Sequence, residues 1–220
     1  MRAAACILLA VLSATPALAA PKSHGITFGK WTPVKWFVGP DENKAFDLRV
    51  RALYVDGRAK EFTLGAPHDI TDRLFVVRRA FRLNDSLPEE TVPDWRWERG
   101  GWLLVDRVSG HISPLTLTEF DPYHSAASWY RDYIAYCGVS DDGQKLFAIV
   151  SQLDRRKPIL KQSLGDATVG DLPDSACPAP VWQRQPISIT FHTEKGQKQT
   201  YTIRGHAADA INDDDEEDRK

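Results

Sequence analysis

Apolar residues of this chain recur at every second position in short runs, and helical spacing is hard to find after the first twenty residues. The runs are rich in Val, Ile, Phe, Tyr, Trp and Thr, and they are bounded by Gly, Pro, Asp or Asn. Such alternation is typical of β-strands, because successive side chains of a strand point to opposite faces. The pattern predicts an all-β protein built from antiparallel meander sheets.

Short polar pairs between these runs predict the turns. Asp-Gly is a strong hairpin signal because the tight turn needs positive φ, which Gly adopts at little cost. We therefore expect hairpins at Asp56-Gly57 and Asp142-Gly143. Gly100-Gly101 is expected to join "WRWER" to "WLLVD" as a further hairpin, and other turns are expected at Ser109-Gly110 and Lys195-Gly196.

The strands fall into two kinds. Residues 47–55 and 187–193 are apolar on one face only, which predicts that their other face meets water. Residues 132–139 are apolar on both faces, and strands of this second kind predict either stacked sheets in more than one layer or blades packed around an axis. One face of this run carries Tyr133, Ala135, Cys137 and Val139, and the other carries Ile134 and Tyr136.

Two neighbouring stretches carry a resemblance. "WLLVDRVSGHISPLT" (102–116) and "SWYRDYIAYCGVSDDGQKLFAIV" (128–150) are similar to the strand and turn pattern of exported bacterial β-propellers of the TolB type. The resemblance covers about 60 residues and implies a small or irregular β-propeller, with a β-sandwich as the alternative. Three of the expected hairpins are also spaced by about 42 to 44 positions, near the length of one blade. In this chain "WYRDY" replaces the family's usual Ser-Pro-Asp-Gly turn.

The two ends of the chain predict its compartment and domain limits. Residues 1–19 combine Arg2, a short apolar run and the small-residue pattern Ala17-Leu18-Ala19, as a secretory signal peptide does. The protein is therefore expected to be exported, to the periplasm or beyond, without a membrane span. Residues 20–208 are expected to form a single all-β domain. The acidic run in 209–220 predicts a disordered tail.

Composition narrows the possible partners and cofactors. Cys137 and Cys177 are the only cysteines after the signal peptide, and in an oxidising compartment they predict a disulfide; two buried thiols are the alternative. A net charge of −2 argues against a nucleic-acid partner. The six histidines show no metal-ligand spacing, so neither a metal nor another cofactor is predicted.

Catalytic motifs are weak. Ser140 in "GVSDD" resembles a nucleophile elbow, but it lacks the final Gly and the following helix, so we interpret it as a turn residue. A hydrolase acting on envelope or polysaccharide material is the alternative function. It would require polar groups to converge in one cleft, for which we list Glu119, Asp121, His111 and His124.

Aromatic residues gather between positions 119 and 133. Aromatic side chains with adjacent polar groups suit sugars and extended peptides, although such residues also fill β cores. We therefore predict a non-catalytic binding protein, with a protein or glycan of the cell envelope as its partner. The predicted binding residues are Tyr123, His124, Trp129, Tyr130, Arg131 and Asp132.

Overall fold

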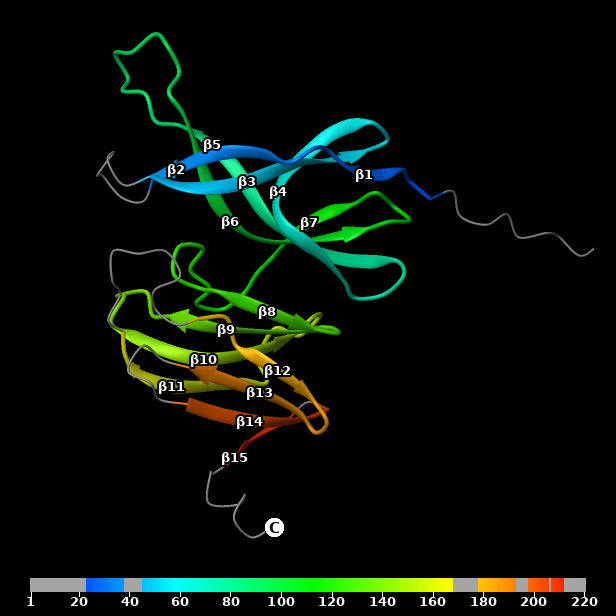
Figure 1. The fold of residues 1–220 in the computed structure, drawn as a ribbon, viewed down its shortest axis with the longest axis vertical. Coiled ribbons are helices and arrows are strands. Elements are labelled where there is room, and N and C mark those ends of the chain that lie inside the picture. The colour runs from blue at the N-terminus through cyan, green and yellow to red at the C-terminus, as the bar shows by residue number, and fades with distance from the viewer. Residues whose placement is uncertain (1–22, 38–44, 168–177, 193–197, 206, 212–220) are drawn as a thin grey trace, which may run out of the picture.

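The computed structural model describes residues 23–37, 45–167, 178–192, 198–205 and 207–211, the last of these by backbone only. The described residues form β-strands joined by turns and contain no helix. All strand pairs are antiparallel, and they make three sheets, none of them closed (Figure 1). The prediction of an all-β protein of antiparallel meanders is confirmed.

The three sheets follow one another along the chain. The N-terminal sheet has the order β1-β3-β4-β5-β6-β7, and β2 also pairs with β3. Its strands are β1 (Ile26–Phe28), β2 (Thr32–Phe37), β3 (Ala45–Val55), β4 (Arg58–Asp69), β5 (Leu74–Asn84), β6 (Trp95–Asp106) and β7 (Ile112–Leu115).

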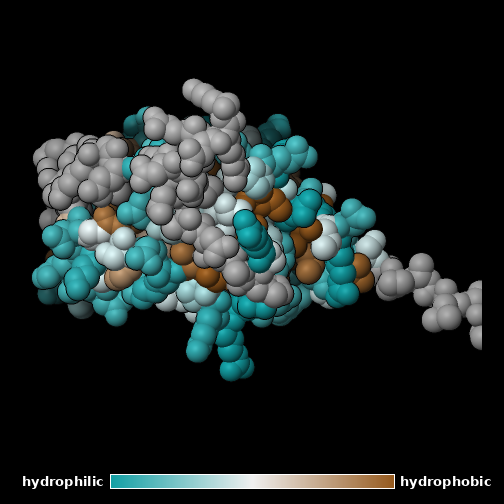
Figure 2. Space-filling model, turned by 90° about the horizontal axis from the view of Figure 1, so that it is seen from below, coloured by the Kyte–Doolittle hydropathy of each residue, from teal (hydrophilic) through white to brown (hydrophobic). Residues whose placement is uncertain are grey.

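The two later sheets have four strands each and run in simple sequence order. The middle sheet contains β8 (Ala127–Tyr130), β9 (Tyr133–Val139), β10 (Lys145–Gln152) and β11 (Leu160–Asp166). The C-terminal sheet contains β12 (Val181–Arg184), β13 (Ile187–His192), β14 (Lys198–Arg204) and β15 (Ala207–Ile211). Figure 2 views the end of the molecule at which the C-terminal sheet lies, where apolar residues form separate patches between polar ones.

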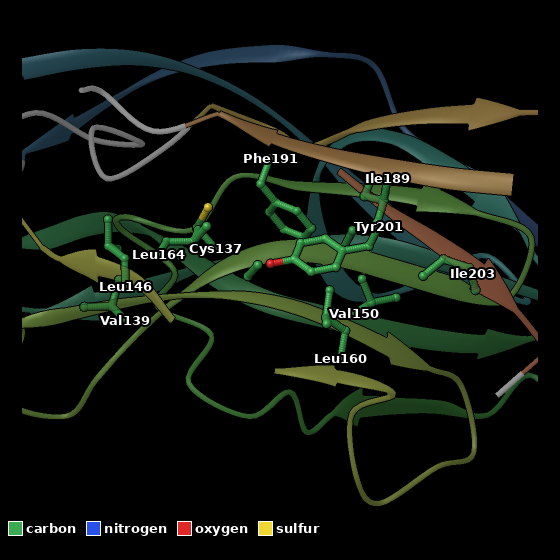
Figure 3. Close-up of a cluster of buried hydrophobic side chains, with 12 residues drawn as sticks. Cys137, Val139, Leu146, Val150, Leu160, Leu164, Ile189, Phe191, Tyr201 and Ile203 are labelled. Atoms are coloured by element: carbon green, nitrogen blue, oxygen red, sulfur yellow. The ribbon is translucent and has the colours of Figure 1, made fainter. Parts of the chain in front are cut away.

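The middle sheet is covered on both faces. On one face Cys137 and its alternate neighbours pack against Ile189 and Phe191 of the C-terminal sheet (Figure 3). On the other face, Ile134 and Tyr136 pack with residues that include Trp102 of the N-terminal sheet. The two-sided pattern of residues 132–139 is confirmed, and it produces stacked layers.

The one-sided pattern predicted for residues 47–55 is wrong. Val50 packs on one face of β3, whereas Leu53 on the other face is 0 % exposed. The reason is that β3 has two partners at one edge: β2 pairs with its first half and β1 with its second half. β1 places Phe28 beside Leu53 and so buries the face that the pattern assigned to water.

The N-terminal sheet also curls, so that β2 lies near β6. Trp36 Nε1 donates a hydrogen bond to Glu98 Oε2 (3.1 Å), and the guanidinium carbon of Arg99 lies 4.9 Å from the centre of the Trp36 ring. The curl places residues of β3 and β6 on the walls of one hollow.

The hairpin predicted at Gly100-Gly101 is wrong, because β6 runs through both glycines as one strand. The pairing of β5 with β6 shifts there: Arg78 lies opposite Trp102, and Ala80 lies opposite Arg99. The glycines accommodate a β-bulge, a feature with the same sequence signal as a tight turn. The middle one of the three regularly spaced hairpins is therefore absent, and the regular spacing does not hold.

Three of the other predicted turns lie where the sequence places them. Asp56 (φ 52°) and Gly57 (φ 75°) join β3 to β4, and Gly143 (φ 70°) lies between β9 and β10. Gly110 (φ 65°) lies between β6 and β7. Lys195-Gly196 lies outside the described residues.

The described residues reach into the C-terminal range predicted as a tail, but they do not include the predicted signal peptide. β15 pairs with β14 and includes residues 209–211, so the strand extends into the range predicted as tail; residues 212–220 lie outside the description. The signal peptide also lies outside it. Within the described residues, no helix has the length and apolarity that crossing a membrane requires.

Candidate functional site

The predicted binding loop lies at a seam between the N-terminal and middle sheets. Trp129 stacks on His68, with ring centres 5.8 Å apart, and meets the Trp102 ring edge-on at 5.4 Å. The indole nitrogens of both tryptophans are buried and have no hydrogen-bond partner among the described residues. The Trp129 ring therefore joins two sheets.

Tyr123 belongs to the same seam. Its hydroxyl donates to Glu98 Oε2 (2.6 Å), and its ring centre lies 5.4 Å from that of Trp36. Burial, together with the Glu98 carboxylate, raises the pKa of Tyr123 to about 12. His124 donates from its backbone to Asp121 Oδ1 (3.2 Å), and its Nδ1 is buried without a partner in the described part of the chain.

Tyr130 ends β8, and Arg131 and Asp132 form the turn to β9. Arg131 has a φ of 52°, and its carbonyl accepts a hydrogen bond from His68 Nε2 (2.8 Å). The Tyr130 ring lies 5.6 Å from Trp182, and Asp132 Oδ2 accepts from Gln152 (2.8 Å). The six predicted residues are thus divided between a seam and a turn, and their role in binding stays a prediction.

A crevice beside Trp129 holds only about 60 Å³. It is lined by residues 115–118 and 151–156 together with Trp129 and Ile134. Small-molecule sites typically hold roughly 300–1,000 Å³, so this crevice is well below the usual size of a ligand site.

The residues considered for catalysis serve local structure. Ser140 Oγ donates to Asp142 Oδ1 and accepts from the backbone of Lys145 (2.9 Å), which is the turn role that its sequence predicts. Glu119 pairs with Lys161 (2.8 Å). Asp121 accepts from two backbone amides, and His111 lies in the turn before β7. Within the described residues, no cluster of three or more His, Cys, Asp or Glu could hold a metal.

Cys137 is fully buried between the middle and C-terminal sheets (Figure 3). Cys177 lies outside the described residues, and the Cys137–Cys177 disulfide stays a prediction.

A larger site lies in the curl of the N-terminal sheet. We call it the sheet hollow; it holds about 420 Å³ and is open to solvent. Its lining comes from the β1–β2 connection and from strands β2, β3, β4 and β6: Gly29, Lys30, Thr32, Val50, Arg51, Ala52, Tyr54, Phe62 and Trp97.

Tyr54, Phe62 and Trp97 give the sheet hollow three aromatic side chains. Phe62 and Trp97 meet edge-on, with ring centres 5.0 Å apart. The guanidinium carbon of Arg82 lies 5.9 Å from the Phe62 ring and 5.5 Å from the Trp97 ring. At Gly29 an added Cβ would lie 3.2 Å from the Tyr54 ring, so the glycine allows the chain to pass close to this wall.

Arg51 borders the sheet hollow and is held by two rings. Its guanidinium carbon lies 4.0 Å from the centre of Phe28 and 4.3 Å from that of Trp31. Burial lowers the pKa of Arg51, but an arginine stays charged in proteins. Its Nε is buried and has no hydrogen-bond partner among the described residues.

Sequence reasoning missed the sheet hollow. Lys30, Tyr54, Phe62 and Trp97 lie far apart in the chain, and only the pairing and curl of the strands bring them together. The "WRW" triplet at 95–97 was a visible signal, because alternate tryptophans place two large rings on one strand face.

The described residues therefore define an all-β protein of three antiparallel sheets, with a ligand-sized hollow in the first. Comparisons with protein-family models, curated proteins and solved structures find no match to this chain.

Proposed function

We propose that this chain is an exported, non-catalytic binding protein of the cell envelope, and that it takes a small ligand in the sheet hollow. The observation that carries the proposal is a space of about 420 Å³ walled by Tyr54, Phe62 and Trp97. Small-molecule sites are typically concave, mostly apolar and roughly 300–1,000 Å³ in volume, with a few polar groups that orient the ligand. Thr32 and Tyr54 supply hydroxyls in this lining.

The Trp129 region supports ligand binding less well. Its largest rings pack against residues of neighbouring strands, and the crevice beside them holds about 60 Å³. Within the predicted set, Arg131 has the exposed side chain and is the residue best placed to meet a macromolecular partner.

The test is recovery of a small molecule with protein purified natively from the cell envelope, using mass spectrometry of extracts. Wild type and Trp95→Ala should carry the same compound, because Trp95 is 55 % exposed and does not line the hollow. Trp97→Ala removes one aromatic wall of the hollow, and Ala52→Leu fills part of its space. Each variant should therefore carry at least tenfold less of the compound than the wild type does.

The melting temperature of each variant shows whether it is folded. If Trp97→Ala unfolds, the test relies on Ala52→Leu alone. Equal recovery from wild type and a folded Ala52→Leu variant contradicts binding in the hollow. Recovery of no compound from the wild type also counts against the proposal.

A further inference from the structure

We infer that the sheet hollow selects a small amphipathic anion, with a planar or apolar body against Phe62 and Trp97 and an acidic group at Lys30. This inference rests on the proposed function and adds the chemical class of the ligand.

Charge is the first argument. Among the described residues, the charged ones that line the sheet hollow are Lys30 and Arg51, and both are cationic. The acids on nearby strands are already engaged: Glu61 pairs with Arg79 (2.9 Å), and Glu98 accepts hydrogen bonds from Trp36 and Tyr123. The field at the lining is therefore positive, which favours an anion and disfavours a cation of the same shape.

Arg51 provides the second argument. Its buried Nε–H has no acceptor among the described residues, and buried donors in folded proteins are normally satisfied. The rings of Phe28 and Trp31 lie 4.0 and 4.3 Å from the guanidinium carbon and so fix the guanidinium beside the β1–β2 connection. A ligand oxygen with negative charge is the acceptor that an arginine bonds most strongly.

The side chains that line the sheet hollow favour a ligand with an apolar or planar body. Val50, Ala52 and Phe62 give aliphatic and aromatic surface on one side, and Trp97 gives an indole ring from β6. Aromatic walls bury flat ligands at low entropic cost. Lys30 is exposed at the β1–β2 connection, where it can meet an acidic group while the body lies deeper.

Calorimetric titration of the mature protein at pH 7 and low salt tests the inference with three probes of one shape. The probes are 2-naphthoate, neutral 2-naphthamide and 2-naphthylmethylammonium. We expect 2-naphthoate to bind at least tenfold more tightly than the ammonium compound, with an affinity that falls as salt is added.

Lys30→Gln should weaken 2-naphthoate at least threefold and leave 2-naphthamide unchanged. Lys60→Gln is the matched control, because Lys60 is an exposed cation on β4 that does not line the hollow. Both substitutions lie at exposed positions, so both variants should fold.

The outcomes separate the two claims. If 2-naphthamide and the ammonium compound bind as tightly as 2-naphthoate, the inference about charge is overturned and the binding site stands. An equal effect of Lys30→Gln and Lys60→Gln also overturns it. If none of the three probes binds, the sheet hollow is not a small-molecule site and both claims fail.

Discussion

The side chain of Asp106 holds the end of β6 and the turn that follows it. Asp106 ends β6. Its two carboxylate oxygens share the Nε–H of Arg73 (2.9 and 3.0 Å), one of them also accepts from Arg73 Nη2, and the other accepts from the backbone of Val108 (2.8 Å). These bonds, with Arg73 first, hold the pKa of Asp106 well below its ordinary value. The same residue also anchors the turn that leads into β7.

Asp106→Asn should lower the free energy of unfolding, and the loss should depend on pH. A carboxyl whose folded pKa is depressed stabilises the protein above its unfolded pKa, about 3.9, and this contribution is lost as pH falls toward the folded pKa. Urea unfolding at several pH values should show the largest gap between wild type and variant near pH 7, shrinking below about pH 4.

Asp69→Asn is a charge-matched control, because Asp69 forms an exposed ion pair with Arg107 and such pairs contribute at most about 1 kcal/mol. A gap that stays constant from pH 7 to pH 2 would contradict the role assigned to Asp106.

At the scale of elements, the Gly100 bulge shapes the N-terminal sheet. It lets β6 continue from the wall of the sheet hollow at Trp97 to the seam at Trp102. An added Cβ at Gly100 would lie 3.0 Å from Arg79 Cβ and 3.3 Å from the Arg79 carbonyl oxygen, both on β5. A side chain at Gly100 would therefore require β5 to shift by a few tenths of an ångström.

Gly100→Ala should destabilise the protein by about 1–3 kcal/mol, because the methyl group meets a paired strand that can move little. Gly101→Ala is the matched control: no heavy atom lies within 4 Å of its added Cβ, so a change of at most about 0.5 kcal/mol is expected. Chemical denaturation measures both. Equal stability of the two variants would show that the close contact with Arg79 does not destabilise the Gly100→Ala variant.

At the scale of the whole molecule, the seam around Trp129 joins the N-terminal sheet to the middle sheet. The ring contacts with His68 and Trp102 cross this seam, and Arg78 Nη2 also crosses it to the carbonyl oxygen of Pro122 (2.7 Å). Trp129, which the sequence suggested for partner binding, thus packs the two sheets against each other.

Trp129→Ala should lower the free energy of unfolding by more than about 2 kcal/mol, because removing a packed indole leaves a cavity between two sheets. Trp95→Ala, at a position 55 % exposed, should change it by about 0.5 kcal/mol or less. Denaturation midpoints check both values. Unchanged stability of Trp129→Ala, with loss of partner capture, would instead favour a binding role for this residue.

Sequence alone determined the features that depend on neighbouring residues. Alternation of apolar side chains gave the strands, and Asp56-Gly57 and Asp142-Gly143 gave two turns, because side-chain direction and positive φ are local properties. The two-sided run at 132–139 predicted a strand buried on both faces, in stacked sheets or in blades, and β9 is buried on both faces.

Tertiary structure decided what depends on distant partners. It made Gly100-Gly101 a bulge, because β5 continues alongside both halves of β6, and it buried Leu53 beneath β1. It also brought Lys30, Phe62 and Trp97 to one hollow and placed Trp129 in a seam. Periodicity reports which face a residue takes within its own strand, whereas the curl and stacking of sheets decide what covers that face.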